Sequence, residues 1–336
     1  MVNILYFVGN FKILCYTYCI MENLERYKHL NKYLKDKFCE RTLKICIDGG
    51  FTCPNRDGTT GIGGCIFCSE RGSGEHIKSG NQTIMNDCNF ADKISDQVRN
   101  YFSSYKAERA NKFIAYFQNF TNTYGHIDIL KAKYDAALID DRIVALAIAT
   151  RPDCINEDIC QLLKSYTDKY YVWIELGLQT CNDATGKLIN RCYSSDQFSK
   201  AVALLNKYNI DVVTHVMVGL PNENFEDFKN TVNFINSHDI QGLKIHSTYV
   251  VKNTVLADMY ASGTYTPITL EYYLNSVAYI LTHINPNIVI HRISGDAPKD
   301  LLVAPDWNSH KKWIINGLDK LLREQDLWQG MYYEKN

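Results

Sequence analysis

Residues 51–68 read FTCPNRDGTTGIGGCIFC, and this glycine-rich stretch decides the fold. Cys53, Cys65 and Cys68 follow a C-x11-C-x2-C spacing, directly after a short apolar run at 44–48. Thiolates are soft ligands that suit iron–sulfur clusters and zinc. Three of them on one loop predict a single inorganic centre at the end of a first β-strand.

Outward from this loop, short apolar runs alternate with amphipathic helical stretches. The predicted strands are KICID at 44–48, KFIAYF at 112–117, VALAIA at 144–149, YVWIELGL at 171–178, DVVTHVMVGL at 211–220 and LKIHSTYV at 243–250. Such continuously apolar strands are typical of parallel sheets covered by helices. Six β–α units predict an α/β fold, an open or partial (β/α)6 barrel, with functional residues at the carboxyl ends of the strands.

The hydrophobic pattern divides the chain into four segments. Residues 1–20 are an apolar leader, interrupted by polar residues and lacking a small-residue cleavage site, so we expect neither a signal peptide nor a membrane span. Met21 is the expected start, because residues 21–40 read as an amphipathic N-terminal helix. Residues 41–250 form the barrel and residues 251–336 a small C-terminal α+β extension. Within that extension we expect a helix at 269–284, a strand at 287–294 and a helix at 308–324.

Charge and cysteine content narrow the functional class. The 336 residues carry a formal net charge of −1, so no global positive field draws the protein to nucleic acid or to a membrane. Nucleic-acid binding would need a local basic patch. The twelve cysteines are scattered rather than arranged as a disulfide framework, which predicts reduced thiols and a cytoplasmic location.

Three cysteine ligands would leave one iron of a [4Fe–4S] cluster open. Such an iron can chelate the amino and carboxylate groups of a methionine moiety, as the reductive cleavage of S-adenosylmethionine (SAM) requires. The alternative is a Cys3His zinc knuckle with His76 as the fourth ligand, because a structural zinc site is closed by four ligands.

The cysteine loop resembles that of the YhcC/YtqA-type (MnmL-like) radical SAM family, which is related to the catalytic subunit of Elongator. The similarity runs from Met21 to the C-terminus and includes AYFQNFTNTY at 115–124, IATRPDCI at 148–155, WIELGLQT at 173–180, THVMVGLP at 214–221, LKIH at 243–246 and HRISGDAP at 291–298. The resemblance implies a radical SAM enzyme that uses its [4Fe–4S] cluster to cleave SAM to a 5′-deoxyadenosyl radical.

The same resemblance implies a tRNA substrate and defined partners. The expected reaction converts wobble 5-carboxymethylaminomethyluridine to 5-aminomethyluridine, which a downstream tRNA methyltransferase then methylates. An electron donor such as flavodoxin or ferredoxin is also implied. Two alternatives stay open: a radical SAM enzyme acting on a small metabolite or peptide, and a non-catalytic RNA-binding module that carries zinc or an iron–sulfur cluster.

Several residues near the strand ends are expected to contact the cofactors. Phe67 would shield the cluster and flank the adenine, unless it only packs in the core. Gln118, Asn119 and Asn122 follow the second strand, where radical SAM enzymes hold the SAM amino group; capping of a turn is the alternative.

The third and fourth strands supply the next candidates. Thr150 and Arg151 end the third strand, and the Arg151 guanidinium would bind a carboxylate of SAM or substrate, with a surface ion pair as the alternative. Glu175 lies in an otherwise apolar strand and needs a partner, which we expect to be a cationic or hydroxyl group of SAM. Gln179 would contact the ribose.

The fifth and sixth strands carry two candidate catalytic histidines. His215 and His246 would face the substrate or transfer a proton, or else be hydrogen-bonded core histidines. Met217 and Gly219, between them, are assigned to the cofactor pocket. Further along, His291, Arg292 and Asp296 cluster in the predicted C-terminal strand and the turn after it. Cations combined with an aromatic ring, suited to phosphate contact and base stacking, then follow at Lys311, Lys312 and Trp313. A solvated helix start is the alternative for the last three.

Overall fold

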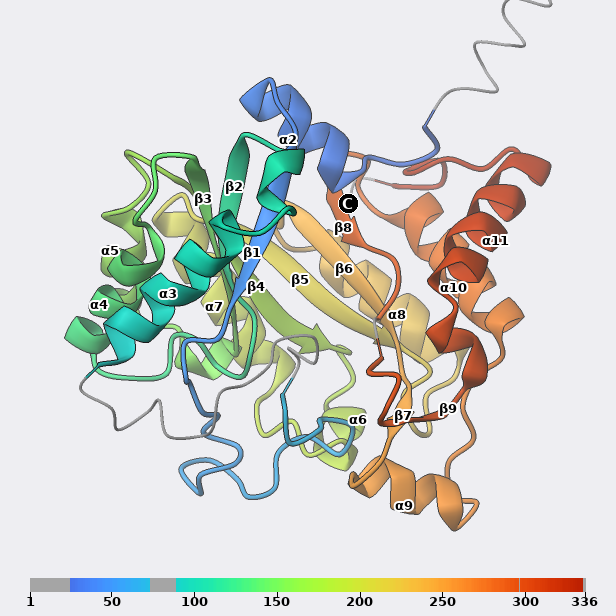
Figure 1. The fold of residues 1–336 in the computed structure, drawn as a ribbon. Helices are drawn as coiled ribbons and strands as arrows, with labels where there is room; N and C mark the ends of the chain where they lie inside the picture. Colours follow the sequence, from blue (N-terminus) through green and yellow to red (C-terminus); the bar gives the residue numbers. More distant parts are fainter. Residues whose placement is uncertain (1–24, 73–88, 296, 335–336) are drawn as a thin grey trace, which may run out of the picture.

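A seven-stranded parallel sheet, curled into a half-barrel, forms the centre of the molecule (Figure 1). The computed structural model describes residues 25–72, 89–295 and 297–334. The strand order is β1-β2-β3-β4-β5-β6-β8, with every neighbouring pair parallel. The strands are β1 Thr42–Ile47, β2 Lys112–Phe117, β3 Ile143–Thr150, β4 Tyr171–Gln179, β5 Asp211–Val218, β6 Gly242–Ser247 and β8 Val289–Arg292. The prediction of a partial α/β barrel is confirmed, and the strand expected near 287–294 joins the sheet as its seventh member.

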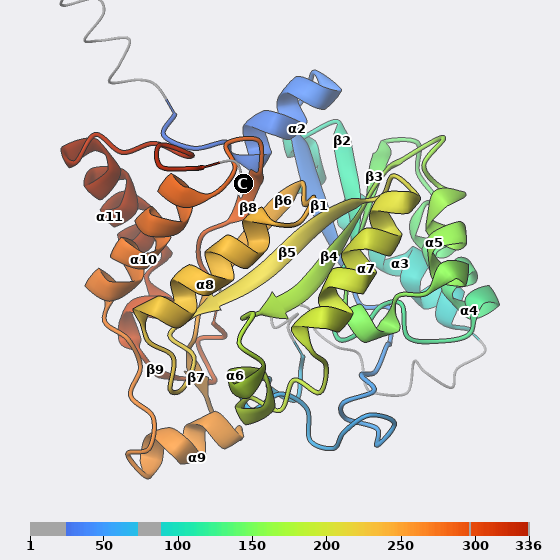
Figure 2. The same cartoon turned by 180° about the vertical axis from the view of Figure 1, so that it is seen from behind.

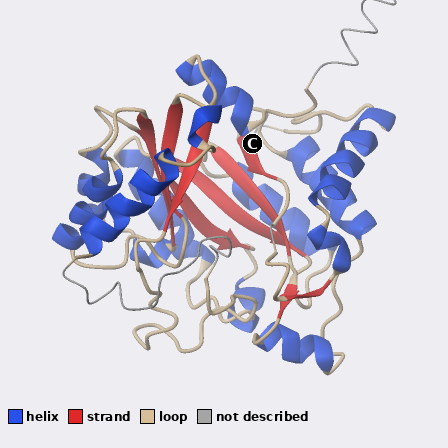
Figure 3. Ribbon diagram, in the orientation of Figure 1, coloured by secondary structure: helices blue, strands red, loops and turns tan. Residues whose placement is uncertain are grey.

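Helices cover the outer face of the sheet, as Figures 2 and 3 show. The α-helices are α2 Leu30–Phe38, α3 Phe90–Phe102, α4 Ile127–Ala137, α5 Glu157–Lys164, α6 Asp183–Leu188, α7 Ser195–Lys207, α8 Phe225–Asn236, α9 Val255–Ala261, α10 Leu270–His283 and α11 Lys311–Glu324. Short 3-10 turns are η2 Ala107–Arg109, η3 Pro152–Cys154 and η4 Asp306–Ser309. A small antiparallel pair, β7 Val250–Val251 with β9 Leu302–Ala304, lies beyond β6. No helix in the described part of the chain is long and apolar enough to cross a membrane.

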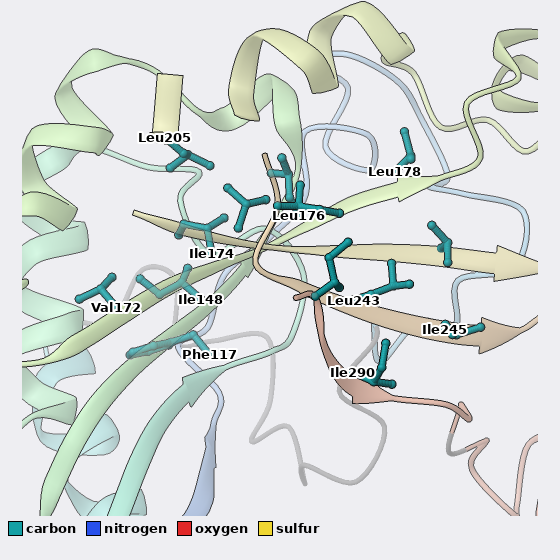
Figure 4. Packing of buried hydrophobic residues seen from close by; sticks show 14 of the residues in the cluster. Phe117, Ile148, Val172, Ile174, Leu176, Leu178, Leu205, Leu243, Ile245 and Ile290 are labelled. Atoms are coloured by element: carbon teal, nitrogen blue, oxygen red, sulfur yellow. The ribbon is translucent and has the colours of Figure 1, made fainter. Parts of the chain in front are cut away.

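Successive side chains of each strand point alternately toward the covering helices, where they form the core, and toward the inside of the half-barrel, the lumen. Outward-facing residues such as Phe117, Ile148, Ile174 and Leu243 pack against the helices in one large buried cluster (Figure 4). Inward-facing residues form a second cluster that includes Ala147 on β3. Small alanines on the inner face of β3 leave room for a ligand, whereas the apolar outer face supplies the stabilising burial.

The N-terminal helix is shorter than the pattern predicts. Residues 25–29 are not helical, and α2 begins at Leu30 with His29 in an extended conformation. His29 pairs with Ile290 of β8 in an isolated parallel bridge, and the Ile290 amide donates to the Lys28 carbonyl at 2.8 Å. Pairing with the sheet edge therefore overrides helical propensity there. Leu30 and Leu34 are buried as the apolar stripe predicts; Met21 and the leader lie outside the described residues.

Candidate active site

The cysteine loop follows β1 at the carboxyl end of the sheet, and its own side chains brace it. The Arg56 guanidinium donates to the carbonyl oxygens of Cys68 and Ser69 at 3.0 and 2.6 Å. The Asn55 amide lies 3.8 Å from the Cys65 sulfur, and the Cys68 amide donates to the Cys65 carbonyl at 3.0 Å. These bonds fix the path of the chain between the second and third cysteines.

Gly64 is required by this bracing. Its φ of +82° lies in the left-handed region, and an added Cβ would stand 2.9 Å from Arg56 Nε. Any larger residue would therefore displace the guanidinium that holds the loop.

The three thiols lie within electrostatic range of one another. Burial, together with the neighbouring Cys68 and Cys53, raises the pKa of Cys65 to about 12, whereas Arg151 acts in the opposite direction. Buried thiolates in such a group need a positive centre between them. In the described ranges no three His, Cys, Asp or Glu side chains are gathered closely enough to hold a single metal ion. Three thiolates are a donor set whose chemistry suits an iron–sulfur cluster; His76, the alternative zinc ligand, lies outside the described residues.

A cavity of about 130 Å³ lies beside Cys68, inside the barrel mouth. Its lining brings together six predicted site residues, namely Phe67, Gln118, Gln179, His215, Met217 and His246. Gln179 has a φ of +67° and follows a register shift between β4 and β5, a local irregularity of the kind that redirects a side chain. His246 lines the cavity, and among the described residues its Nε2 is buried without a hydrogen-bond partner.

Asn119 is the strongest indication of a missing polar ligand near the strand ends. It is 1% exposed, and neither atom of its side-chain amide finds a hydrogen-bond partner within the described structure. Asn122, in contrast, donates its side-chain amide to the Ala149 carbonyl of β3 at 2.7 Å, although its Oδ1 is also buried without a partner among the described residues. The Asn122 amide thus already ties the loop to the sheet, whereas a contact of Asn119 with a ligand stays a prediction.

Three further predicted residues line neither cavity of the barrel. Thr150 shares a 2.6 Å hydrogen bond with Thr123. The Arg151 guanidinium forms a two-bond ion pair with Asp153, at 2.9 and 2.6 Å, and lies close enough to Cys65 to affect its titration. Gly219, with φ of +85°, packs against Ile268. Their contacts to SAM or substrate stay predictions.

Glu175 finds its partner inside the protein. Its side chain is fully buried, accepts a hydrogen bond from Tyr116 Oη at 2.5 Å, and is ion-paired with Lys244. Lys44 Nζ lies 3.5 Å from Oε1 of the Glu175 carboxylate, and His215 Nε2 lies 3.2 Å from Oε2. The expected need for a counter-charge is thus met by two lysines from β1 and β6.

These contacts set the charge states in the lumen. Burial would raise the pKa of Glu175, but Lys244, Lys44 and His215 hold it well below its ordinary value. Burial lowers the pKa of His215 to about 4, so its ring is neutral at pH 7. A neutral His215 donates its Nε2–H to the ionised carboxylate and keeps Nδ1 as an acceptor.

A second and larger cavity, of about 560 Å³, opens between β1 and β8. It meets the first at Tyr116, Gln118, Lys244 and Arg292, which line both. Four cationic side chains contribute to it, those of Lys44, Lys244, Arg292 and Lys311, and none of its described lining residues is an aspartate or glutamate. Asp296 lies outside the described residues.

The family is decided by comparison with known proteins. The radical SAM superfamily model matches residues 53–235, and the model of the radical SAM C-terminal domain matches residues 240–324. The chain belongs to the radical SAM superfamily. Within it, the chain is 35% identical over 311 residues to the YtqA protein of Bacillus subtilis (strain 168), covering 93% of this chain and 94% of that protein. It is 32% identical over 292 residues to the YhcC protein of Escherichia coli (strain K12), with coverage of 87% and 90%. This radical SAM protein is thus a member of the YhcC/YtqA family.

The family is related to Elongator. Elongator complex protein 3 of Saccharomyces cerevisiae is 26% identical over 207 residues, which cover 60% of this chain and 36% of that protein. A tRNA uridine(34) acetyltransferase of Dehalococcoides mccartyi is 30% identical over 167 residues, with coverage of 48% and 36%. The crystallised Elp3 of Methanocaldococcus infernus has the same fold, with a TM-score of 0.61, 18% identity and coverage of 86% of this chain and 64% of that one.

This radical SAM enzyme therefore has a [4Fe–4S] cluster and SAM as its cofactors. Cys53, Cys65 and Cys68 are the residues that would hold the cluster, and contacts of Asn119 and His246 with SAM or substrate stay predictions. When bound, the cofactors supply the reductive cleavage of SAM, for which the enzyme needs an electron donor. The residues of the chain position the ligands and exclude water.

The sequence reasoning missed Lys44, Tyr116 and Lys244. Each of them is a polar residue that stands next to an apolar, outward-facing residue in a strand. The same alternation with a period of two identified Glu175 as an inward-facing residue. Lys244 in particular is a charge within the apolar run LKI, and it should have been read together with Glu175 as a possible buried pair.

Proposed function

We propose that this radical SAM enzyme modifies tRNA, converting wobble 5-carboxymethylaminomethyluridine to 5-aminomethyluridine. The observation that carries the proposal is the cationic cavity of about 560 Å³, which joins the smaller cavity beside Cys68. An anionic nucleotide matches its lysine and arginine lining, and the junction at Tyr116 and Lys244 would bring the modified base toward the cofactor end.

The names of two relatives support an RNA substrate. Elongator complex protein 3 and the tRNA uridine(34) acetyltransferase match 60% and 48% of this chain, and the second name specifies a uridine of tRNA. By this proposal the partners are tRNA, a donor such as flavodoxin or ferredoxin, and a methyltransferase that acts on the aminomethyl product.

The start of α11 provides a surface for RNA at the cavity rim. Trp313 is 55% exposed and stacks on His310 with ring centroids 4.1 Å apart. Lys311, two residues before it, lines the larger cavity. An exposed indole beside lysines suits the stacking of an unpaired anticodon base.

The test is anaerobic turnover by the reconstituted enzyme with dithionite. Bulk tRNA from a strain lacking the gene serves as substrate, and 5′-deoxyadenosine and wobble nucleosides are measured by mass spectrometry. We expect deoxyadenosine formation that the tRNA enhances, together with loss of the carboxymethylaminomethyl nucleoside and gain of the aminomethyl nucleoside.

Two other outcomes would redirect the assignment. Cleavage of SAM that is indifferent to tRNA would move the search to a small metabolite or peptide. A protein with zinc and no acid-labile sulfide would support the non-catalytic RNA-binding alternative. The Cys68→Ala variant is the control for reactions that do not depend on the cluster.

A further inference from the structure

Two lysines share one buried carboxylate in the barrel lumen. Lys244 is ion-paired with one oxygen of Glu175, and Lys44 Nζ lies 3.5 Å from the other. The nearby His215 and His246 are neutral, because burial lowers the pKa of both. Two amino groups thus face a single carboxylate, and when both are protonated this group of three carries a surplus of one positive charge.

The surplus faces the cavities rather than the protein core. Glu175 is fully buried and lines neither cavity, whereas Lys244 lines both and Lys44 lines the larger one. The Lys44 side chain keeps 24% of its surface exposed. A ligand that enters between β1 and β8 therefore meets the ammonium groups and not the carboxylate.

The lysines also keep hydrogen-bond donors for a ligand. Lys244 Nζ donates to Tyr116 Oη at 2.8 Å and to Glu175, which engages two of its three N–H groups. Among the described contacts, Lys44 makes one ion pair and otherwise lies over the rings of Tyr116 and Trp173, at 4.5 and 5.8 Å from their centroids. Contacts with a ring face leave the N–H groups available.

We propose that Lys44 and Lys244 bind a carboxylate of the substrate at the junction of the two cavities. A monoanion balances the surplus charge, and charge in a low-dielectric site is stable only when it is compensated. The identity of that carboxylate rests on the proposed function, because the carboxymethylaminomethyl group ends in one. A tRNA phosphodiester also carries one negative charge, and the test below distinguishes the two anions.

Titration calorimetry on the cluster-reconstituted enzyme tests this assignment without turnover. The probes are the free nucleoside 5-carboxymethylaminomethyluridine, its carboxamide analogue, which keeps the amine but lacks the carboxylate charge, and inorganic phosphate. We expect the carboxylate to bind about tenfold more tightly than the carboxamide, the effect of one charge-assisted hydrogen bond. Lys44→Gln should abolish that difference and Lys44→Arg should restore it.

A matched control separates this site from general electrostatics. Lys200→Gln removes a charge from an exposed lysine that is paired with Asp196 on α7, and it should leave the tenfold preference intact. Equal binding of carboxylate and carboxamide to the wild-type enzyme would overturn the assignment. Lys44-dependent binding of phosphate with no preference for the carboxylate would overturn it too.

The inference and the proposed function fail separately. A Lys44-dependent preference for the carboxylate in an enzyme that leaves tRNA unchanged would retain the anion site and reject the tRNA reaction. Conversion of tRNA without that preference would retain the reaction and reject the site.

Discussion

The two cavities of the barrel share four lining residues but differ in how their polar groups are compensated. The smaller one, beside Cys68, is lined by His246, whose Nε2 is buried without a partner among the described residues, as is the side-chain amide of Asn119. In the larger one, Lys44 and Lys244 are already paired with Glu175, and Lys244 also lines the smaller one. By the proposed function the smaller cavity is the cofactor end and the larger one the substrate end, so the cofactor end adds neutral groups without partners and the substrate end adds charges that are partly compensated.

This difference separates two ways of preparing a site. An unpartnered neutral amide costs the folded protein little beyond its desolvation, and a ligand gains the whole hydrogen bond. A buried ion pair costs far more when either partner is removed. Changes at the cofactor end should therefore alter ligand binding, and changes in the lysine–glutamate group should alter stability as well.

The largest effect is expected at the cofactor end. Cys65→Ala removes one of the three thiolates that would hold the cluster, so the purified protein should lose its iron and acid-labile sulfide and show no SAM cleavage. Metal and sulfide analysis after reconstitution gives the measurement. Cys181→Ser, which changes a thiol outside the loop, should retain both. A Cys65→Ala protein with a full complement of iron would exclude Cys65 as a ligand.

Next in size is the cost of removing the shared carboxylate. Glu175→Gln leaves Lys244 buried without its counter-charge, so the free energy of unfolding should fall by about 3–5 kcal/mol. Anaerobic urea denaturation measures the loss. The double variant with Lys244→Met should recover a large part of it. A loss below about 1 kcal/mol would show that the pair is more hydrated than the structure indicates.

The two asparagines sharpen the comparison further. Asn119→Ala should weaken SAM binding about tenfold without lowering the unfolding free energy, because its amide has no partner to lose among the described residues and its burial is itself destabilising. Asn122→Ala should instead lower stability by about 1 kcal/mol, since it loses the bond to Ala149. Calorimetry with SAM and urea denaturation on both variants provide the test. A reversed pattern would exchange the two roles.

Proton release from Lys244 should tune carboxylate binding at the junction. Burial lowers the pKa of Lys244 to about 7, so the ammonium is present at pH 6 and largely lost at pH 8. Carboxylate affinity should therefore fall about tenfold over that range, with the loss occurring as pH rises. The charged and titratable groups around Lys244 are Lys44, Tyr116, Glu175, His215, His246, His291 and Arg292.

The histidines of that set do not titrate in this range, because burial lowers the pKa of all three. Affinity that stays flat between pH 6 and pH 8 would remove Lys244 from the site and leave Lys44 alone. Calorimetry of the free nucleoside at four pH values distinguishes the two cases.

The smallest effect is expected at the rim of the larger cavity. Trp313→Ala should weaken tRNA binding about fivefold, the lower end of what one stacked base contributes. Filter binding at fixed salt measures it, because the electrostatic part of the affinity depends on ionic strength. Trp328→Ala is the matched control, since Trp328 is 45% exposed and lines neither barrel cavity. Equal losses in both variants would refute a specific stacking role.

Period-two patterns and strand ends predicted most of the site. The apolar runs located six strands of the sheet, and the parallel arrangement then placed Gln118, Gln179 and His215 at one cavity. A buried carboxylate was identified at Glu175 by its apolar neighbours. Its partners Lys44 and Lys244 are 131 and 69 residues away in the chain, and only the curl of the sheet brings them together.

Local patterns also failed where distant contacts decide the outcome. Helical periodicity at residues 25–29 gave way to pairing with β8, and the ion pair of Arg151 with Asp153 depends on the turn that follows β3. The sequence does not distinguish Asn119 from Asn122, because both are asparagines that follow the same strand. Only the structure shows that the Asn122 amide donates to Ala149, whereas the Asn119 amide has no partner among the described residues.

The bridge between His29 and Ile290 has a consequence for solubility. Edge strands of open sheets expose unpaired backbone groups, and such edges promote association between chains. In this molecule β1 and β8 are both edge strands, and α2 packs against both of them. The bridge pairs the Ile290 amide with the Lys28 carbonyl. The segment before α2, which is synthesised early, thus shields β8, the last strand of the seven-stranded sheet to be synthesised. Once β8 is in place, the half-barrel is protected from edge-to-edge aggregation.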